Sequence, residues 1–374
     1  MESDKLTSKT IKFLRFPLAC MVVYIHYVPM LFTSPTNVGE WCFDILASTL
    51  SHTLSSIAVP TFFLISGFLY FRKISEWNKT VYFTKTRSRF KTLIMPYIYW
   101  NIIYIVVYVL LEFTYHSPTL NEFLQTHLSW HALWDSSHWE GGLWCFGIFD
   151  SPCNTGPVLL PFWFFRNLIV IVLLSPIIYF LIRRLGKWLL AILIFCYLSN
   201  IWIQYSPLSI TGFLFFCIGA YLSINQLDLV RTFMHFEKIV YTITSITFIV
   251  VLFSDIYNQP QLIAIVKPWF KLAGVISAIC VASRIVAKWK CETMISLAST
   301  TFFIYATQSI LIYDYSRTGI NKVLGWVLCT DSVTFQTLHL VLTPIVTIVV
   351  CILLFYTLKR FTPRILGVLT GNRL

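Results

Sequence analysis

Apolar runs of about twenty residues, the length of helix that crosses the hydrocarbon core of a bilayer, recur along the whole of this 374-residue chain. Only 12% of the residues are charged, which is about half the share found in soluble domains. Together these features predict an all-α integral membrane bundle formed by one domain, 1–374, and they argue against a soluble globule. The ten predicted spans cover 13–33, 51–71, 93–112, 161–182, 188–204, 209–225, 238–254, 268–285, 294–314 and 334–358.

The basic residues are distributed unequally between the connections of these spans. With ten spans both termini lie on one side of the membrane, and the segments on that side hold 23 of the 28 Lys and Arg residues. By the positive-inside rule, this bias places both termini in the cytoplasm, as in a bacterial inner-membrane protein. The net charge of +12 is then explained by topology and by membrane lipid, and no nucleic acid is needed as a partner.

Two ionisable residues lie in the first span, Arg15 near its start and His26 in its interior. They are eleven residues apart, so on a helix they share one face, with about 20° of slip, and lie roughly 16 Å apart along the axis. Ionisable groups inside a membrane usually face protein cavities and mark functional sites. His26 is therefore a candidate general base, or a base that relays an acyl group, and Arg15 is a candidate ligand of a phosphate or carboxylate. The alternatives are a histidine that packs helices together and an arginine that reaches the inner headgroups.

Further polar residues interrupt the other predicted spans. They are, in chain order, Ser66, Tyr97, Asn101, Arg166, Asn167, Tyr305 and Gln308. Each is a candidate substrate contact, or else a polar group that holds neighbouring helices together. Ser66 is followed by Gly67, and small residues of this kind let two helices approach closely.

The predicted cytoplasmic loop 72–92 holds seven basic residues, among them Arg89 and Lys91. Such a cluster attracts anionic lipid headgroups, worth about 1 kcal/mol per residue. The functional alternative is a dock for a polyanionic, nucleotide-bearing cofactor.

The predicted outer loop region 113–160 has no Lys or Arg but is rich in His and Trp. Tryptophans with acids and amides suit stacking on a sugar, and interfacial tryptophan belts have a similar composition. His127 and His131 have the spacing of two metal ligands on one helical face, but without clear further ligands no metal is predicted. Cys145 and Cys153 close the shortest loop among the cysteines of the outer side and are the candidate disulfide.

Several segments together resemble the acyltransferase type 3 family of integral membrane acyltransferases. The first span has the family's Arg-x10-His signature, here Arg15 and His26, and STTFFIYATQSIL resembles the penultimate span, with Gln308 where many members have a histidine. The other matching segments are FFLISGFLYF (62–71), RFKTLIMPYIYWN (89–101), FWFFRNLIVIVLLSPII (162–178) and FLFFCIGAYL (213–222).

The resemblance implies an O-acyltransferase that moves an acyl group, usually acetyl from cytoplasmic acetyl-CoA, to a hydroxyl of a cell-envelope carbohydrate or glycolipid. It marks Arg15 and His26 as essential. The acyl-CoA donor is then expected near Arg15, Arg89, Lys91 and Tyr97. The acceptor is expected near Asn101, Arg166, Asn167, Ser66, Tyr305 and Gln308. The protein could also form a homodimer, which the sequence leaves open. The alternative function is that of a transporter or flippase, a class often recognised by two inverted repeats in the sequence.

Overall fold

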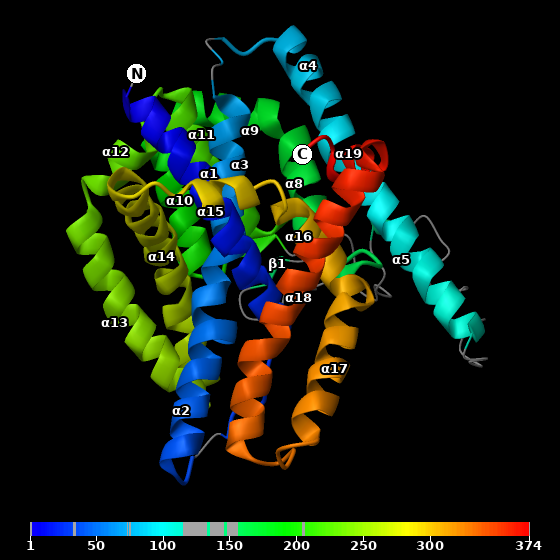
Figure 1. Cartoon of the computed structure of the whole chain (residues 1–374). Helices are drawn as coiled ribbons and strands as arrows, with labels where there is room; N and C mark the ends of the chain where they lie inside the picture. The colour runs from blue at the N-terminus through cyan, green and yellow to red at the C-terminus, as the bar shows by residue number, and fades with distance from the viewer. Residues whose placement is uncertain are drawn as a thin grey trace.

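The structure is a computed structural model that describes residues 2–32, 35–72, 74, 76–114, 133–134, 146–147, 156–203 and 206–373. Within these residues it is a bundle of helices, and both ends of the chain lie in the upper part of the view (Figure 1). The described strands are β1 (Phe146–Gly147) and β2 (Trp202–Ile203), which pair antiparallel. The predicted all-α class is therefore confirmed for the described residues. That the shared end faces the cytoplasm stays a prediction from the basic residues.

The helices follow one another with few extended segments. In chain order they are α1 (Glu2–His26), α2 (Val38–Ala47), α3 (Ala58–Phe71), α4 (Lys79–Arg89), α5 (Met95–Thr114), α8 (Trp163–Leu173), α9 (Ser175–Leu185), α10 (Lys187–Leu198), α11 (Ile210–Ile224), α12 (Leu229–Met234), α13 (Glu237–Ile256), α14 (Pro260–Lys288), α15 (Glu292–Leu297), α16 (Thr301–Thr307), α17 (Tyr313–Gly325), α18 (Val333–Phe361) and α19 (Pro363–Thr370). Short π-helical or 3₁₀-helical segments join or flank several of them. The π-helical segments are η1 (Ser48–Thr53), η3 (Phe90–Ile94) and η6 (Gln308–Ile312), and the 3₁₀ segments are η2 (Leu54–Ile57), η4 (Leu160–Phe162) and η5 (Ser206–Leu208).

Five continuous helical stretches among the described residues are long and apolar enough to cross a membrane. They are Val38–Phe71, Lys79–Leu111, Glu237–Ile256, Pro260–Lys288 and Val333–Phe361. A sixth crossing is available if the bent pair Leu160–Leu173 and Ser175–Leu185, which meet at 64°, forms one span. These helices are consistent with an integral membrane protein. Their number, five or six, is lower than the ten spans predicted from the sequence.

The first helix differs from the predicted span 13–33, because α1 begins at Glu2 and ends at His26. The backbone then turns, with the amide of Tyr27 donating to the carbonyl of Tyr24 at 3.1 Å. Pro29 explains the early end, since a proline disfavours helical backbone at the residue before it and cannot donate to the helix. His26 therefore lies at the end of a helix rather than in the interior of one.

The predicted loop 72–92 is also largely helical. Asn78 caps α4, its side-chain oxygen accepting from the amide of Val81 at 2.8 Å. From Lys79 the helix continues through η3 into α5. Arg89 is therefore carried on a rigid element rather than on a loop.

The closest helix pair in the core is α3 with α11. A Cβ at Gly67 would lie 2.1 Å from the carbonyl oxygen of Phe216, and one at Gly219 would lie 2.0 Å from that of Leu64. Only glycine permits this approach, which confirms the prediction for Gly67. The tight contact fixes α3, and with it Ser66, against the cavity described next.

Candidate active site

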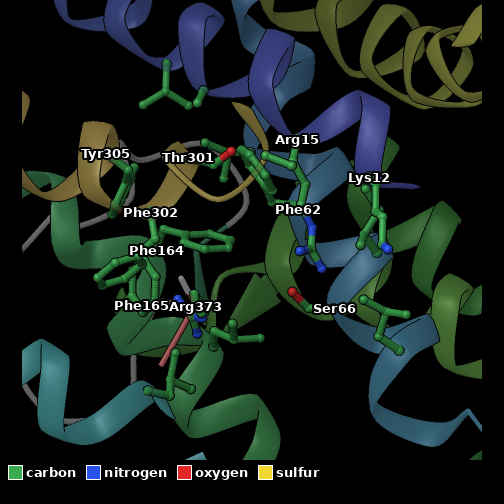
Figure 2. Close-up of a pocket in the computed structure, with 18 of the residues that line it drawn as sticks. Lys12, Arg15, Phe62, Ser66, Phe164, Phe165, Thr301, Phe302, Tyr305 and Arg373 are labelled. Atoms are coloured by element: carbon green, nitrogen blue, oxygen red, sulfur yellow. The ribbon is translucent and has the colours of Figure 1, made fainter. Parts of the chain in front are cut away.

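A cavity of about 450 Å³ opens between α1, α3, α8 and α16 (Figure 2). Its walls are mainly aromatic and aliphatic, with Phe62, Phe164 and Phe302 among them. Its polar lining is dominated by cations. The four basic residues that line it are Lys12, Arg15, Arg89 and Arg373. An apolar cavity with a few convergent charges has the character of a small-molecule site, and the sign of the charge selects an anionic ligand.

One face of α1 forms a wall of this cavity. Lys12, Arg15, Ala19 and Val22 line it, and their spacing of three and four residues is that of a single helical face. His26 follows Val22 by four residues on the same helix, so it continues this face about one turn, roughly 6 Å, further along. Thus α1 confirms the shared face of Arg15 and His26. Arg15 lies in the cavity, whereas His26 lies one turn beyond its described lining.

Among the residues that the structure describes, the arginines of the cavity have no acidic partner. In the described part of the chain, the ion pairs join His52 to Asp255, Arg72 to Asp4 and Arg284 to Glu237. Arg89 instead lies over the ring of Tyr70, 5.7 Å from its centroid. Because the described lining brings together like charges and no carboxylate, it has a net positive charge that an anion would neutralise.

Two of the four residues predicted to bind the donor line the cavity, namely Arg15 and Arg89. Lys91 is exposed and does not line it. Tyr97 is buried, but its hydroxyl donates to the carbonyl of Leu133 at 2.5 Å and its ring stacks on that of Phe162. Neither side chain is therefore placed to contact a donor in this cavity.

Of the residues predicted to contact the acceptor, Ser66 and Tyr305 also line the cavity. Ser66 faces it from α3 beside Arg15, as Figure 2 shows. The hydroxyl of Tyr305 donates to the carbonyl of Pro161, and its ring stacks on Phe162 at a centroid distance of 5.6 Å. Tyr305 thus forms an ordered wall of the cavity.

Three other residues that are predicted to contact the acceptor make hydrogen bonds within the protein. Asn101 donates to the carbonyl of Tyr97 at 2.8 Å and accepts from the amide of Leu159 at 3.1 Å. Arg166 is fully buried and donates to the carbonyl of Trp134 at 2.9 Å. Asn167 donates to the hydroxyl of Ser209 at 3.2 Å. None of the three lines the cavity, because each side chain is directed to a neighbouring segment.

Gln308 lies where α16 bends. It begins η6, within which Ile310 and Leu311 leave helical geometry and Leu311 has a φ of 64°. Its side chain is 2% exposed, and neither polar atom has a hydrogen-bond partner in the described structure. An unpartnered buried amide is costly, and Gln308 does not line the cavity.

Two of the basic residues of the cavity, Lys12 and Arg373, were not predicted from the sequence as site residues. Lys12 had a readable signal, because it precedes Arg15 by three residues and so shares its face. Arg373 had none, since only the tertiary fold brings it to Thr92, 281 residues away.

No cluster of His, Cys, Asp or Glu that could hold a metal occurs among the described residues. His127, His131, Cys145, Cys153 and most of loop 113–160 lie outside them.

A family model described as an acyltransferase domain matches residues 9–358, which is nearly the whole chain. The protein therefore belongs to this acyltransferase family, the type 3 family that its motifs resemble. A relative is the succinoglycan biosynthesis protein ExoH of Rhizobium meliloti (strain 1021). The two are 24% identical over 386 residues, which cover 99% of this chain and 94% of the relative. No solved structure matches the chain.

Proposed function

We propose that this protein is a membrane O-acyltransferase that moves an acyl group from acyl-CoA to a hydroxyl of a cell-envelope polysaccharide or glycolipid. The observation that carries the proposal is the cationic cavity on the face of α1 that continues to His26. Family membership supports the reaction class. The name of the relative, a protein of succinoglycan biosynthesis, supports a polysaccharide acceptor.

The positive charge and the aromatic lining of the cavity support acyl-CoA as the donor. The phosphates of CoA are held by Arg15 and Arg89 at the end of the cavity that we assign to the cytoplasm. The slender pantetheine arm then lies along the aromatic wall, which includes Phe62 and Phe164. This arrangement points the thioester along α1 towards His26. The acyl group is acetyl or a larger relative such as succinyl.

The chemistry needs one base at the far end of α1. The imidazole of His26 accepts the proton of the acceptor hydroxyl as its oxygen attacks the thioester carbonyl. The tetrahedral intermediate then collapses, the C–S bond breaks, and the departing thiolate takes the proton from the imidazolium. In the relay variant the imidazole itself is acylated first and the hydroxyl attacks the acyl-imidazole. Both routes end with an ester and CoA.

The test is transfer by the purified protein in detergent or vesicles. Acetyl-CoA and succinyl-CoA are supplied with envelope polysaccharide, and both thiol release and acyl incorporation are measured. We expect acceptor-dependent thiol release that His26→Ala abolishes while the variant remains folded in the membrane. Full activity of His26→Ala would remove His26 from the mechanism. Flux of an envelope glycan across vesicles, without any acyl transfer, would favour the transporter instead.

A further inference from the structure

The segment that follows α19 is fixed in the wall of the cavity. Gly371 ends α19 with a φ of 61°, and a Cβ there would lie 2.7 Å from the carbonyl oxygen of Thr92. The amide of Asn372 donates back to the carbonyl of Gly367 at 2.7 Å, which completes a left-handed helix cap. The indole of Trp100 donates to the carbonyl of Leu369 at 2.9 Å. These contacts seat the segment against η3 and α5.

Arg373 projects from this packed segment into the cavity, as Figure 2 shows. Its Nη2 donates to the carbonyl of Thr92 at 2.8 Å. The guanidinium lies 4.7 Å from the ring centroid of Phe302 and 5.9 Å from that of Phe165. A hydrogen bond on one side and two rings on the others hold it in place.

The charge around Arg373 is not balanced by the protein. Burial, together with the positive charges of Arg89 and Arg15, lowers the pKa of Arg373 to about 10. It therefore stays protonated at neutral pH, so three guanidiniums line one cavity without a carboxylate among the described residues. A ligand with one negative charge would leave most of this charge uncompensated. A diphosphate, with two or more charges and several acceptor oxygens, would compensate it.

We propose that Arg373 binds the diphosphate of the acyl-CoA donor together with Arg15 and Arg89, and that Gly371–Arg373 forms a wall of the donor site. This inference rests on the proposed function and assigns the part of the donor that the segment recognises. Arg373 is thus a binding residue for the nucleotide end of the donor. It takes no part in the transfer step.

The experiment compares two donors, acetyl-CoA and acetyl-pantetheine, of which the second lacks the whole nucleotide end, including the diphosphate. For Arg373→Ala we expect KM for acetyl-CoA to rise about 10- to 100-fold, the loss typical of charge-assisted hydrogen bonds. The kcat, and the KM for acetyl-pantetheine, should stay close to wild type. Arg373→Lys should restore part of the affinity. Gly371→Ala, which pushes the segment away from Thr92, should likewise raise KM for acetyl-CoA and leave KM for acetyl-pantetheine unchanged. The matched control is Arg364→Ala, an exposed arginine of α19, which should change neither donor.

Three outcomes would overturn the assignment: an unchanged KM for acetyl-CoA, an equal loss with both donors, or no rescue by Arg373→Lys. If the wild-type protein uses neither of these acetyl thioesters nor succinyl-CoA, the proposed function fails and Arg373 is judged by inorganic diphosphate alone. A rise in the thermal unfolding midpoint with diphosphate that is present in wild type and absent in Arg373→Ala supports the assignment. An equal rise in both, or none in either, overturns it.

Discussion

Among the described residues, two of the regions that hold ionisable side chains inside the bundle treat them differently. Between η1 and α13, Nδ1 of His52 lies 2.6 Å from the carboxylate of Asp255, and each side chain is 18% exposed. In the cavity beside α1, Arg15, Arg89 and Arg373 have no carboxylate within 4 Å in the described structure. In the first region the protein itself supplies the carboxylate partner of the histidine, and this contact joins two helices. The second keeps its positive charge for a ligand. Each prediction below tests this contrast.

The largest expected effect is on catalysis at the end of α1. His26→Ala should lower kcat about 10²- to 10⁴-fold, the usual contribution of a general base. Donor affinity should change little, because the charges that bind the donor lie in the cavity. Steady-state transfer kinetics measure both quantities. A KM effect without a kcat effect would place His26 in donor binding instead.

Removing a cavity charge should harm binding but not folding. Arg15→Gln should raise KM for the donor about 10- to 100-fold, because a charge-assisted contact is lost. Without donor its thermal unfolding midpoint should be no lower than that of wild type, because like-charge repulsion is relieved. Kinetics and thermal unfolding in detergent are measured on the same preparation. A clear loss of stability would show that Arg15 is paired after all.

The paired region should give the opposite result. Asp255→Asn should lower the free energy of unfolding by about 1–3 kcal/mol, because the partner of His52 is weakened. Transfer kinetics of the folded fraction should match wild type. Denaturant or thermal unfolding provides the measurement. If transfer is lost while stability is unchanged, this region too belongs to the site.

Gln308 sharpens the contrast, since it is a buried polar group without a partner in the described structure. Gln308→Leu should raise the free energy of unfolding by about 1 kcal/mol, as the unpartnered amide is removed. If the amide contacts the acceptor, kcat/KM for the acceptor should fall at the same time. Unchanged acceptor kinetics would leave Gln308 as a helix-bend residue only.

The smallest effect on kcat is expected from removing the hydrogen bond between Tyr27 and His339, which lies just beyond the end of α1. The hydroxyl of Tyr27 and Nδ1 of His339 are hydrogen-bonded at 2.5 Å, and Tyr27 directly follows His26. Tyr27→Phe should lower kcat about tenfold or less, the size of one hydrogen bond, with donor KM unchanged. An effect on KM alone would contradict this positioning role.

The sequence predicted the features that depend on local pattern. Apolar length predicted the helical membrane class, and the 3.6-residue period predicted the common face of Arg15 and His26. It also named Ser66 and Tyr305, which line the cavity. The hydrogen-bond partners of other predicted site residues depend on tertiary contacts that the sequence does not reveal. Asn101 and Arg166 are polar and deep in the bundle, as a substrate contact would be, but their partners, Leu159 and Trp134, come from distant segments.

The end of the first helix and the long-range neighbours of the cavity were also not predicted from the sequence. Pro29 ends α1 before the apolar run ends, so hydropathy alone placed the end of the span too far along the chain. Arg373 reaches the cavity only because Gly371 packs on Thr92. No periodicity in the sequence joins these two segments.

The central claim is that the unpaired cations of the cavity bind the CoA donor, and equilibrium binding of CoA to the purified protein tests it most directly. Wild type is compared with a variant that combines Arg15→Gln, Arg89→Gln and Arg373→Gln, over a range of salt concentrations. We expect wild-type affinity to fall as salt is raised, and the triple variant to bind at least about 100-fold more weakly. Equal affinity of the two proteins for CoA would contradict the account.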